Sequence, residues 1–467
     1  MNNGIDAAIR YAEAENERFL EELKAFIRIP SISALSEHKG DVLAAARWLV
    51  DALTRAGAHG ARLVETAGNP VVYGEWMGKP GAPTALIYGH YDVQPVDPLN
   101  LWQSPPFEPE VRDGKIYGRG TSDDKGQVFM HVKAVEAWLK TVGELPVNVK
   151  FCFEGEEEVG SGSLPGCLEA NRDLFQADVL VISDTSMLAP GRPAICYGLR
   201  GMAALQVDVY GAKGDLHSGI YGGGVPNPIH ALVEILASMH GPDGRVRVEG
   251  FYDRVRELTP EEREAIRELG FDEEALARDL GLTALVGEAG YNYVERTTAR
   301  PTLEINGIYG GFQGEGTKTV IPAEAHAKIT CRLVPDQEPG EIMDLIAAHV
   351  SRHAPVGVRV EVRRFDGGRP YVAPLDHPGI QAAIPAYEAV YGTGPVFTRL
   401  GGSIPIVEEF HRILGLTAVM MGFSLPTENN HAPNEHFDLE NFKKGIQTLC
   451  VYWNELARRG LSEAAGT

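Results

Sequence analysis

Histidine and acidic side chains follow directly after short apolar segments in several parts of this sequence. His90 and Asp92 stand after the apolar run 84–88. Because residues i and i+2 of an extended backbone point the same way, Asp92 can accept a hydrogen bond from one ring nitrogen of His90 while the other nitrogen binds a metal ion. The pair alone is equally compatible with a buried histidine of purely structural role.

Acidic residues recur after the next apolar segments. Asp123 and Asp124 stand in the glycine-rich stretch YGRGTSDDKG, Glu157 and Glu158 in FEGEEEVGSGS, and Asp184 at the end of DVLVIS. A helix N-cap would explain the first group alone, and a solvated charge run would explain the second alone. Because the ends of parallel strands meet at one sheet edge, we instead expect these carboxylates to converge beside the histidine, which indicates a hard or borderline metal ion.

A second imidazole is available near the C-terminus, where ENNHAPNEHF supplies His431 and His436 just after an apolar segment. The five cysteines are scattered and form no CxxC pair, so neither a disulfide framework nor a thiolate zinc site is predicted. Histidine and carboxylate ligands without cysteine suit Zn, Mn or Co. The sequence contains no GxGxxG, P-loop, HExxH or GxSxG motif, which disfavours dehydrogenases, NTPases, zincins and serine hydrolases.

The spacing of apolar residues predicts the elements that must position these side chains. Up to about Arg200, helices and buried strands alternate, which is typical of an α/β fold with a largely parallel sheet. The pattern then changes to that of an α+β domain, in which residues 241–293 form an insertion with the capped helix start Thr259, Pro260 and Glu262. Toward the C-terminus the first pattern resumes. The predicted helices are 5–27, 41–56, 126–139, 227–239 and 441–458, and the predicted strands are 84–88, 147–153, 178–183, 204–210, 325–334, 358–364 and 416–421.

Length and composition limit the class of protein. The chain has 467 residues, of which 44% are hydrophobic and 23% charged, as in ordinary folded proteins of two or three domains. Its net charge of −21 repels phosphate groups, so neither nucleic acid nor an anionic membrane is an expected partner. There is no apolar run of about 18 residues and no signal-like N-terminus, so we expect a cytoplasmic protein without a membrane span.

Seven motifs together resemble those of one enzyme family. In order along the chain they are GHYDVQP, YGRGTSDDKG, EGEEEVGS, ISDTSM, DLHSG, GGSIP and NNHAPNE. The chain thereby resembles the co-catalytic metallopeptidase family of carnosinases, glutamate carboxypeptidases and aminoacylases, and most of all its cytosolic, carnosinase-like dipeptidase branch. The resemblance implies a zinc-exopeptidase-like catalytic domain with a mostly parallel central sheet, residues 1–199 and 376–467, and an inserted α+β lid or dimerisation domain, residues 200–375.

The resemblance also implies a dinuclear centre, with two divalent metal ions per subunit that are zinc or manganese, cobalt being possible. It implies that His90 and Asp184 bind one ion, that Glu158 and His431 bind the other, and that Asp123 bridges both. In that family the peptide bond that follows the bridging aspartate, here Asp123–Asp124, is cis.

Three residues have implied roles in catalysis. Asp92 would orient His90. Glu157 matches the general base of the family, which takes a proton from water and returns it to the leaving amine. His217, in DLHSGIYGG, matches a histidine of the lid domain that each subunit of a homodimer inserts into the active site of its partner to stabilise the oxyanion.

The implied substrate is a dipeptide or short peptide with a free C-terminal carboxylate. Residues that match the carboxylate-binding positions of the dipeptidases are Thr319, Arg332, Gly402 and Ser403. Arginine suits a carboxylate because it can form two parallel hydrogen bonds. Each of these residues also has an ordinary structural interpretation, as a surface ion pair, a strand residue or a helix cap.

Two departures from the dipeptidase branch bear on recognition of the substrate amino group. Leu400 stands where the branch tends to have Glu, and Asp366 stands where it tends to have His. An N-acyl or N-carbamoyl amino acid amidohydrolase on the same scaffold is therefore an alternative function. A non-catalytic protein that binds metal or peptide is a less favoured alternative, because Glu157 is present.

Overall fold

The computed structural model describes residues 3–402 and 404–460, which fall into two compact units. The first comprises the described residues up to 197, residues 373–398 and those from 409 onward; the second comprises 198–372 and 399–408. The short segment 399–408, which the sequence analysis assigned to the catalytic domain, groups with the second unit. It does so because Arg200 donates from its backbone N–H to the carbonyl of Gly402 and from Nε to that of Gly401. The catalytic and dimerisation roles of the two units stay predictions.

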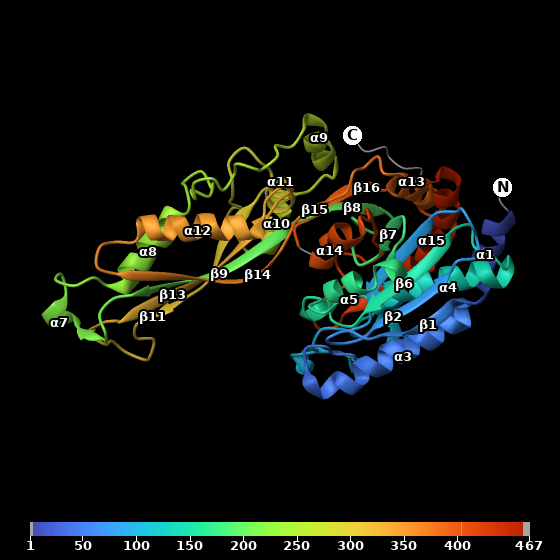
Figure 1. Ribbon diagram of the computed structural model, residues 1–467, viewed down its shortest axis with the longest axis horizontal. Helices are drawn as coiled ribbons and strands as arrows, with labels where there is room; N and C mark the ends of the chain where they lie inside the picture. The colour runs from blue at the N-terminus through green and yellow to red at the C-terminus, as the bar shows by residue number, and fades with distance from the viewer. Residues whose placement is uncertain (1–2, 403, 461–467) are drawn as a thin grey trace. The chain divides into compact units, whose positions relative to one another are not determined.

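A mixed sheet forms the centre of the first unit, with strand order β1-β2-β6-β3-β7-β17-β8 and with β16 paired to β8 (Figure 1). The four central strands β6, β3, β7 and β17 pair in parallel, whereas β1 with β2, β2 with β6 and β17 with β8 pair antiparallel. The bounds are β1 His59–Val64, β2 Val71–Trp76, β3 Thr84–His90, β6 Asn148–Glu154, β7 Val179–Ile182, β8 Ala194–Leu199, β16 Val396–Leu400 and β17 Ala418–Met421.

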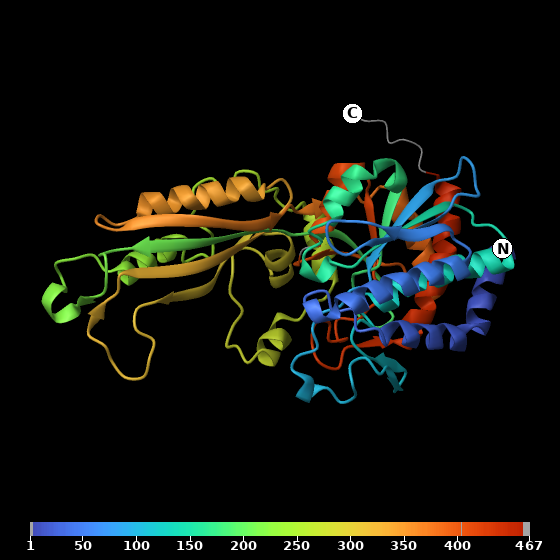
Figure 2. The same ribbon diagram turned by 60° about the horizontal axis from the view of Figure 1, so that its bottom comes forward.

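Helices cover both faces of this sheet, so its central strands are apolar along nearly their whole length. Figure 2 shows the dark blue and blue helices α1–α3 below the sheet and the green α5 above it. Helix α4 is buried around almost its whole circumference and packs against α1 and α15. The helices are α1 Asn3–Ala14, α2 Asn16–Ile27, α3 Lys39–Ala56, α4 Lys125–Thr141, α5 Leu164–Ala170, α6 Arg172–Phe175, α13 Pro378–Tyr391, α14 Pro405–Leu414 and α15 Leu439–Arg459.

A small three-stranded sheet joins distant parts of the first unit. Its order is β18 (His436–Asp438), β5 (Lys115–Tyr117) and β4 (Glu110–Arg112), and the pairs are antiparallel. This pairing holds the loop that contains NNHAPNE beside the loop that contains GRGTSDD, although more than half of the chain lies between them.

The second unit has an antiparallel sheet of order β11-β13-β9-β14, with α8 and α12 packed against it. Its apolar core lies between the sheet and these two helices. The insertion contains α9 and α10 and ends where α11 begins, and the predicted cap is confirmed, because Thr259 and Glu262 form a capping box. The bounds are β9 Gly201–Tyr210, β10 Leu216–His217, β11 Thr302–Gly310, β12 Val320–Ile321, β13 Glu324–Leu333, β14 Arg359–Gly368, β15 Tyr371–Val372, α7 Ser218–Tyr221, α8 Pro228–Ser238, α9 Pro260–Glu268, α10 Glu273–Asp279, α11 Tyr293–Thr298 and α12 Pro339–His353.

The predicted α/β class is confirmed, but the expectation of a mostly parallel sheet is wrong, because antiparallel strands extend the sheet on both sides of its parallel centre. Among residues 3–402 and 404–460, no helix is both long enough and apolar enough to cross a bilayer.

Candidate metal centre

Four of the five predicted metal ligands of the first unit lie at or beyond the ends of neighbouring parallel strands. His90 ends β3, Glu158 lies just after β6, and Asp184 lies just after β7. His431 follows β17, and Asp123 lies directly before the start of α4. Because these four strands are parallel neighbours, their carboxyl ends open onto one edge of the sheet, which explains why residues so far apart in sequence converge.

Asp123 lies between two imidazoles. Its Oδ1 is 3.1 Å from Nε2 of His90, and its Oδ2 is 3.0 Å from Nε2 of His431. Asp184 Oδ2 lies 3.9 Å from the His90 nitrogen, and Glu158 Oε2 lies 3.2 Å from the His431 nitrogen. The carboxylate of Asp123 therefore divides the ligands into the two pairs that the resemblance implies, and the Asp123–Asp124 peptide bond is cis.

This donor set fits divalent cations. His90, Asp123 and Glu158 each offer a ligand atom, and these three atoms lie within 4.8 Å of one another. The donors are imidazole nitrogens and carboxylate oxygens, which suit Zn, Mn or Co, whereas the five cysteines are buried and take no part. The His90 side chain is fully buried, but that of His431 is 56% exposed, which leaves one side of the cluster open to a ligand.

The pKa values of several side chains at this site lie far from their ordinary values. Burial raises the pKa of Asp184 to about 7, and the charge of Asp123 adds to this effect. Burial also holds the pKa of Glu157 well above its ordinary value. Hydrogen bonds to Asp123 and Glu158 raise the pKa of His431 to about 10. Several carboxylates thus crowd together in an apolar setting, an arrangement that bound cations would stabilise.

Asp92 contacts more than the histidine it was predicted to orient. Its Oδ1 lies 3.5 Å from Nδ1 of His90. The same nitrogen lies closer, at 3.0 Å, to the backbone carbonyl oxygen of Asp92. The buried carboxylate also accepts the backbone N–H groups of Glu157 and Glu158, at 3.3 and 3.2 Å. Asp92 therefore connects the His90 loop to the loop that contains the expected base, Glu157, and the expected ligand Glu158.

Sequence reasoning missed Gln94, Glu428 and Glu435, which lie around the cluster, and it named Asp124 without predicting the contact that this residue makes. Gln94 donates to Glu158 Oε2 at 2.7 Å, and Asp124 Oδ2 accepts the backbone N–H of His90 at 3.3 Å. Glu428 and Glu435 lie at either end of the His431 loop and accept hydrogen bonds from residues 120–123. All four stand within or beside the quoted motifs, so the same motifs could have indicated them.

The remaining predicted residues belong to the second unit and form two groups. The pairing of β10 with β12 places His217 beside Val320, next to Thr319, and the carbonyl of Thr319 accepts the backbone N–H of Ser218 at 3.1 Å. Arg332 lies in β13, directly opposite Met202 of β9.

Gly402 accepts a backbone hydrogen bond from Arg200, which stands two residues before Met202, the residue paired with Arg332. Burial, followed by the charge of Arg332, lowers the pKa of Arg200 to about 10. Gly402 and Arg332 thus form the second group. Ser403 and the side chain of Asp366 lie outside the described residues.

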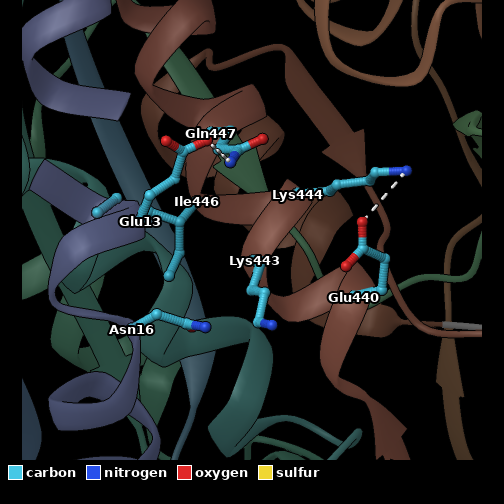
Figure 3. Close-up of a pocket in the computed structure, with 8 residues that line it drawn as sticks. Glu13, Asn16, Glu440, Lys443, Lys444, Ile446 and Gln447 are labelled. Carbon is cyan, nitrogen blue, oxygen red and sulfur yellow. Dashed lines mark hydrogen bonds and ion pairs between the residues drawn. The ribbon is translucent and has the colours of Figure 1, made fainter. Parts of the chain in front are cut away.

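A separate cavity of about 300 Å³ lies among α1, α2 and α15. Figure 3 shows Glu13 bonded to Gln447 and Glu440 paired with Lys444 at its wall. None of the predicted site residues lines this cavity, and its acidic and basic side chains balance in charge.

Comparisons with known proteins agree with the geometry of the cluster. A model of peptidase family M20/M25/M40 matches residues 86–455. The chain is 32% identical to the Cys-Gly metallodipeptidase dug1 of Schizosaccharomyces pombe, over 98% of this chain and 99% of that protein. It is 30% identical to the Beta-Ala-His dipeptidase of Homo sapiens, over 97% and 93%.

A solved structure extends the agreement to the fold. The M20 family metallo-carboxypeptidase Sso-CP2 from Sulfolobus solfataricus superimposes with a TM-score of 0.82 at 35% identity, over 94% of this chain and 99% of that chain. The resemblance and the metallopeptidase class predicted from the sequence are thereby confirmed, and the chain belongs to peptidase family M20/M25/M40.

Proposed function

We propose that this protein is a dinuclear metal-dependent dipeptidase that cleaves the peptide bond of dipeptides or short peptides with a free C-terminal carboxylate. The observation that carries the proposal is the position of Asp123, which offers one carboxylate oxygen to each of two imidazoles. The names of the relatives, a Cys-Gly metallodipeptidase and a Beta-Ala-His dipeptidase, support the substrate class. We assign zinc or manganese to the site, with cobalt as a substitute.

Two groups of residues would hold the cations. His90 and Asp184 serve one ion, Glu158 and His431 serve the other, and Asp123 serves both. Divalent cations at such a site supply Lewis-acid polarisation of a carbonyl and make water more acidic.

The residues of the chain then supply the proton transfers. Glu157 takes a proton from the attacking water and delivers it to the leaving amine. Burial raises the pKa of its carboxylate, which makes it a stronger base than an exposed glutamate. Asp92 holds Glu157 in place through its backbone N–H. Arg332 binds the substrate carboxylate, and His217 stabilises the oxyanion.

Within the second unit, the two groups of substrate-binding residues are too far apart to contact the same dipeptide. Arg332 and Glu324 lie near opposite ends of β13, about 26 Å apart at about 3.3 Å per residue. His217 and Thr319 lie beyond the Glu324 end, where Figure 1 shows α7. This separation supports a homodimer in which Arg332 and Gly402 act on the substrate with His217 and Thr319 of the partner subunit.

A subunit-mixing experiment tests the dimer. Glu157→Gln and His217→Ala proteins are each expected to be nearly inactive. In a mixed dimer, one active site combines an intact Glu157 with an intact His217. Random exchange of subunits is then expected to restore about one quarter of the wild-type rate. A mixture that stays inactive although native mass spectrometry shows mixed dimers would contradict the assignment of His217.

The activity is tested by amino-acid release from free and N-acetylated dipeptides, including Cys-Gly and Beta-Ala-His. The protein is stripped of metal and reloaded with Zn, Mn or Co. We expect metal-dependent release from free dipeptides, which the Glu157→Gln variant loses by at least about a hundredfold while retaining its metal. Release from no peptide in the panel would refute the proposal.

Release from acetylated substrates alone would favour the N-acyl or N-carbamoyl amidohydrolase. The observation that favours this second function is Leu400, an exposed apolar residue where the dipeptidase branch tends to have a glutamate. We also infer a reducing, cytoplasmic location, because all five cysteines are buried and free of disulfides.

A further inference from the structure

The loops that carry two of the expected metal ligands are joined by one buried carboxylate, that of Glu435. This residue is completely buried. Its Oε2 accepts hydrogen bonds from Arg119 Nη1 at 2.8 Å and from the backbone N–H of Gly120 at 3.0 Å. Its Oε1 accepts the backbone N–H groups of Ser122 and Asp123, at 3.0 and 3.1 Å. The loop before α4 therefore folds around this side chain.

Other contacts fasten the same two loops together. Gly118 donates from its backbone N–H to the carbonyl of Glu435 at 3.0 Å. At the opposite end of the His431 loop, Glu428 accepts the Ser122 hydroxyl at 2.7 Å and the Asp438 backbone N–H at 2.8 Å. The connection therefore consists of two buried carboxylates and one backbone carbonyl on the His431 loop, which accept hydrogen bonds from N–H and O–H groups of the loop before α4.

The loop between these carboxylates has an unusual backbone. Asn429, His431 and Asn434 have φ angles of 59°, 58° and 63°, in the left-handed region that residues other than glycine seldom adopt. Such a conformation persists only where surrounding contacts enforce it. Because Glu428 and Glu435 anchor both ends of the loop, they enforce the conformation that brings Nε2 of His431 to 3.0 Å from Asp123.

We propose that Glu435 is a positioning residue that sets the distance between Asp123 and His431, and thereby the affinity for the ion held by Glu158 and His431. This inference rests on the two-ion site proposed above. Metal ligands must be placed within a few tenths of an ångström, and residues that orient them typically contribute 10- to 100-fold to affinity. The other ion depends on His90, Asp184 and the shared Asp123. Glu435 contacts neither His90 nor Asp184, so the ion at His431, which needs both loops in place, is expected to be affected more strongly than the other.

The test compares Glu435→Gln with a matched control, Glu288→Gln. Glutamine keeps the size of the side chain but replaces one acceptor by an N–H₂ group that faces other donors. Glu288 is also buried and accepts two hydrogen bonds at 2.8 Å from a buried arginine, Arg300, but it lies in the second unit. Both variants are expected to lower the melting temperature, because each removes a buried carboxylate that pairs with a buried arginine.

Metal affinity is measured by competition of Zn²⁺ or Co²⁺ with a chromophoric chelator, and coordination by the visible spectrum of the Co²⁺ protein. In Glu435→Gln we expect one of two binding steps to weaken about 10- to 100-fold with an altered Co²⁺ spectrum. In Glu288→Gln both steps and the spectrum are expected to match the wild type. Equal weakening of both steps, or no weakening, in Glu435→Gln would overturn the inference.

Failure of the proposed function has a different signature, because the wild-type protein itself would then bind fewer than two ions.

A milder variant guards against loss of folding in Glu435→Gln. Ser122→Ala removes one hydrogen bond between the two loops and is expected to weaken the same ion about three- to tenfold. If Ser122→Ala binds both ions as tightly as the wild type, the two loops do not act as a positioning unit, and the inference is wrong.

Discussion

Replacement of Gly89 by alanine should move the start of α4 away from β3 and thereby loosen the metal centre. A Cβ at this position would lie 2.5 Å from Val128 Cγ2 and 2.7 Å from Asp124 Oδ2. Carbon atoms pack at about 3.5 Å or more, so the strand and the helix must separate by about 1 Å. The contact matters because Gly89 precedes His90, and Asp124 both follows Asp123 and accepts the His90 backbone N–H.

The expected magnitude has two parts. Overpacking of this kind costs about 1–3 kcal/mol in the free energy of unfolding. A functional site tolerates displacements of only about 0.5 Å, so a shift of about 1 Å between His90 and Asp123 should weaken metal binding about 10- to 100-fold, or about 1.4–2.7 kcal/mol. The assays are urea unfolding of the metal-free protein and chelator competition for Zn²⁺.

A second substitution separates the steric cause from a general loss of stability. Val128→Ala removes the methyl group that the new Cβ would meet, and alone it should cost about 2 kcal/mol, because Val128 is buried. The double variant should lose at least about 1 kcal/mol less unfolding free energy than the sum of the losses in the two single variants, and its metal affinity should partly recover. Strict additivity, or a Gly89→Ala protein with wild-type metal affinity, would refute the steric reasoning.

Two further predictions concern the second unit. Burial, with the nearby charges of His353 and Arg352, lowers the pKa of His349 to about 4. The unfolded chain therefore binds a proton at His349 more readily than the folded chain does, so stability should fall as the pH drops from about 6.5 toward 4. In urea unfolding, the wild type should lose about 2 kcal/mol more than His349→Leu between pH 7 and pH 5. An equal loss in both proteins would contradict this assignment. Arg332→Lys keeps the charge but loses the bidentate hydrogen bonding to a carboxylate, so kcat/KM for free dipeptides should fall about tenfold or more at unchanged metal content. C-terminally amidated peptides should show no such difference between the two proteins. A similar fall for the amidated peptides would remove Arg332 from carboxylate recognition.

The central strands of the first unit could be predicted because their sequences are typical of buried strands and of no other element. β3, β6 and β7 are short apolar runs bounded by polar residues, and the structure confirms them within two residues of the expected bounds. β1 could not be predicted, since most of its side chains are exposed or half-buried and include His59 and Arg62. The single helix expected over 5–27 is wrong, because it divides at Glu15 into α1 and α2 without a proline or glycine to mark the division.

The candidate metal ligands were predictable because each stands at a strand end or in a motif with several recognisable residues. The residues that hold those ligands were harder to predict. Glu435 is one acid in a polar loop, and only its partners at Gly120, Ser122 and Asp123, about three hundred residues earlier, distinguish it from a solvated side chain. Local sequence patterns do not contain such long-range hydrogen bonds.

The strand order also determines when the enzyme can become active during its synthesis. β17 lies between β7 and β8 in the sheet, yet it is translated after the whole of the second unit. A ribosome that has completed β8 therefore holds a chain with a gap in its main sheet and with unpaired strand edges on both sides of that gap. His431 is made later still. The nascent chain consequently lacks this expected metal ligand until residue 431 has been made, so a product truncated before that residue would carry an incomplete candidate site.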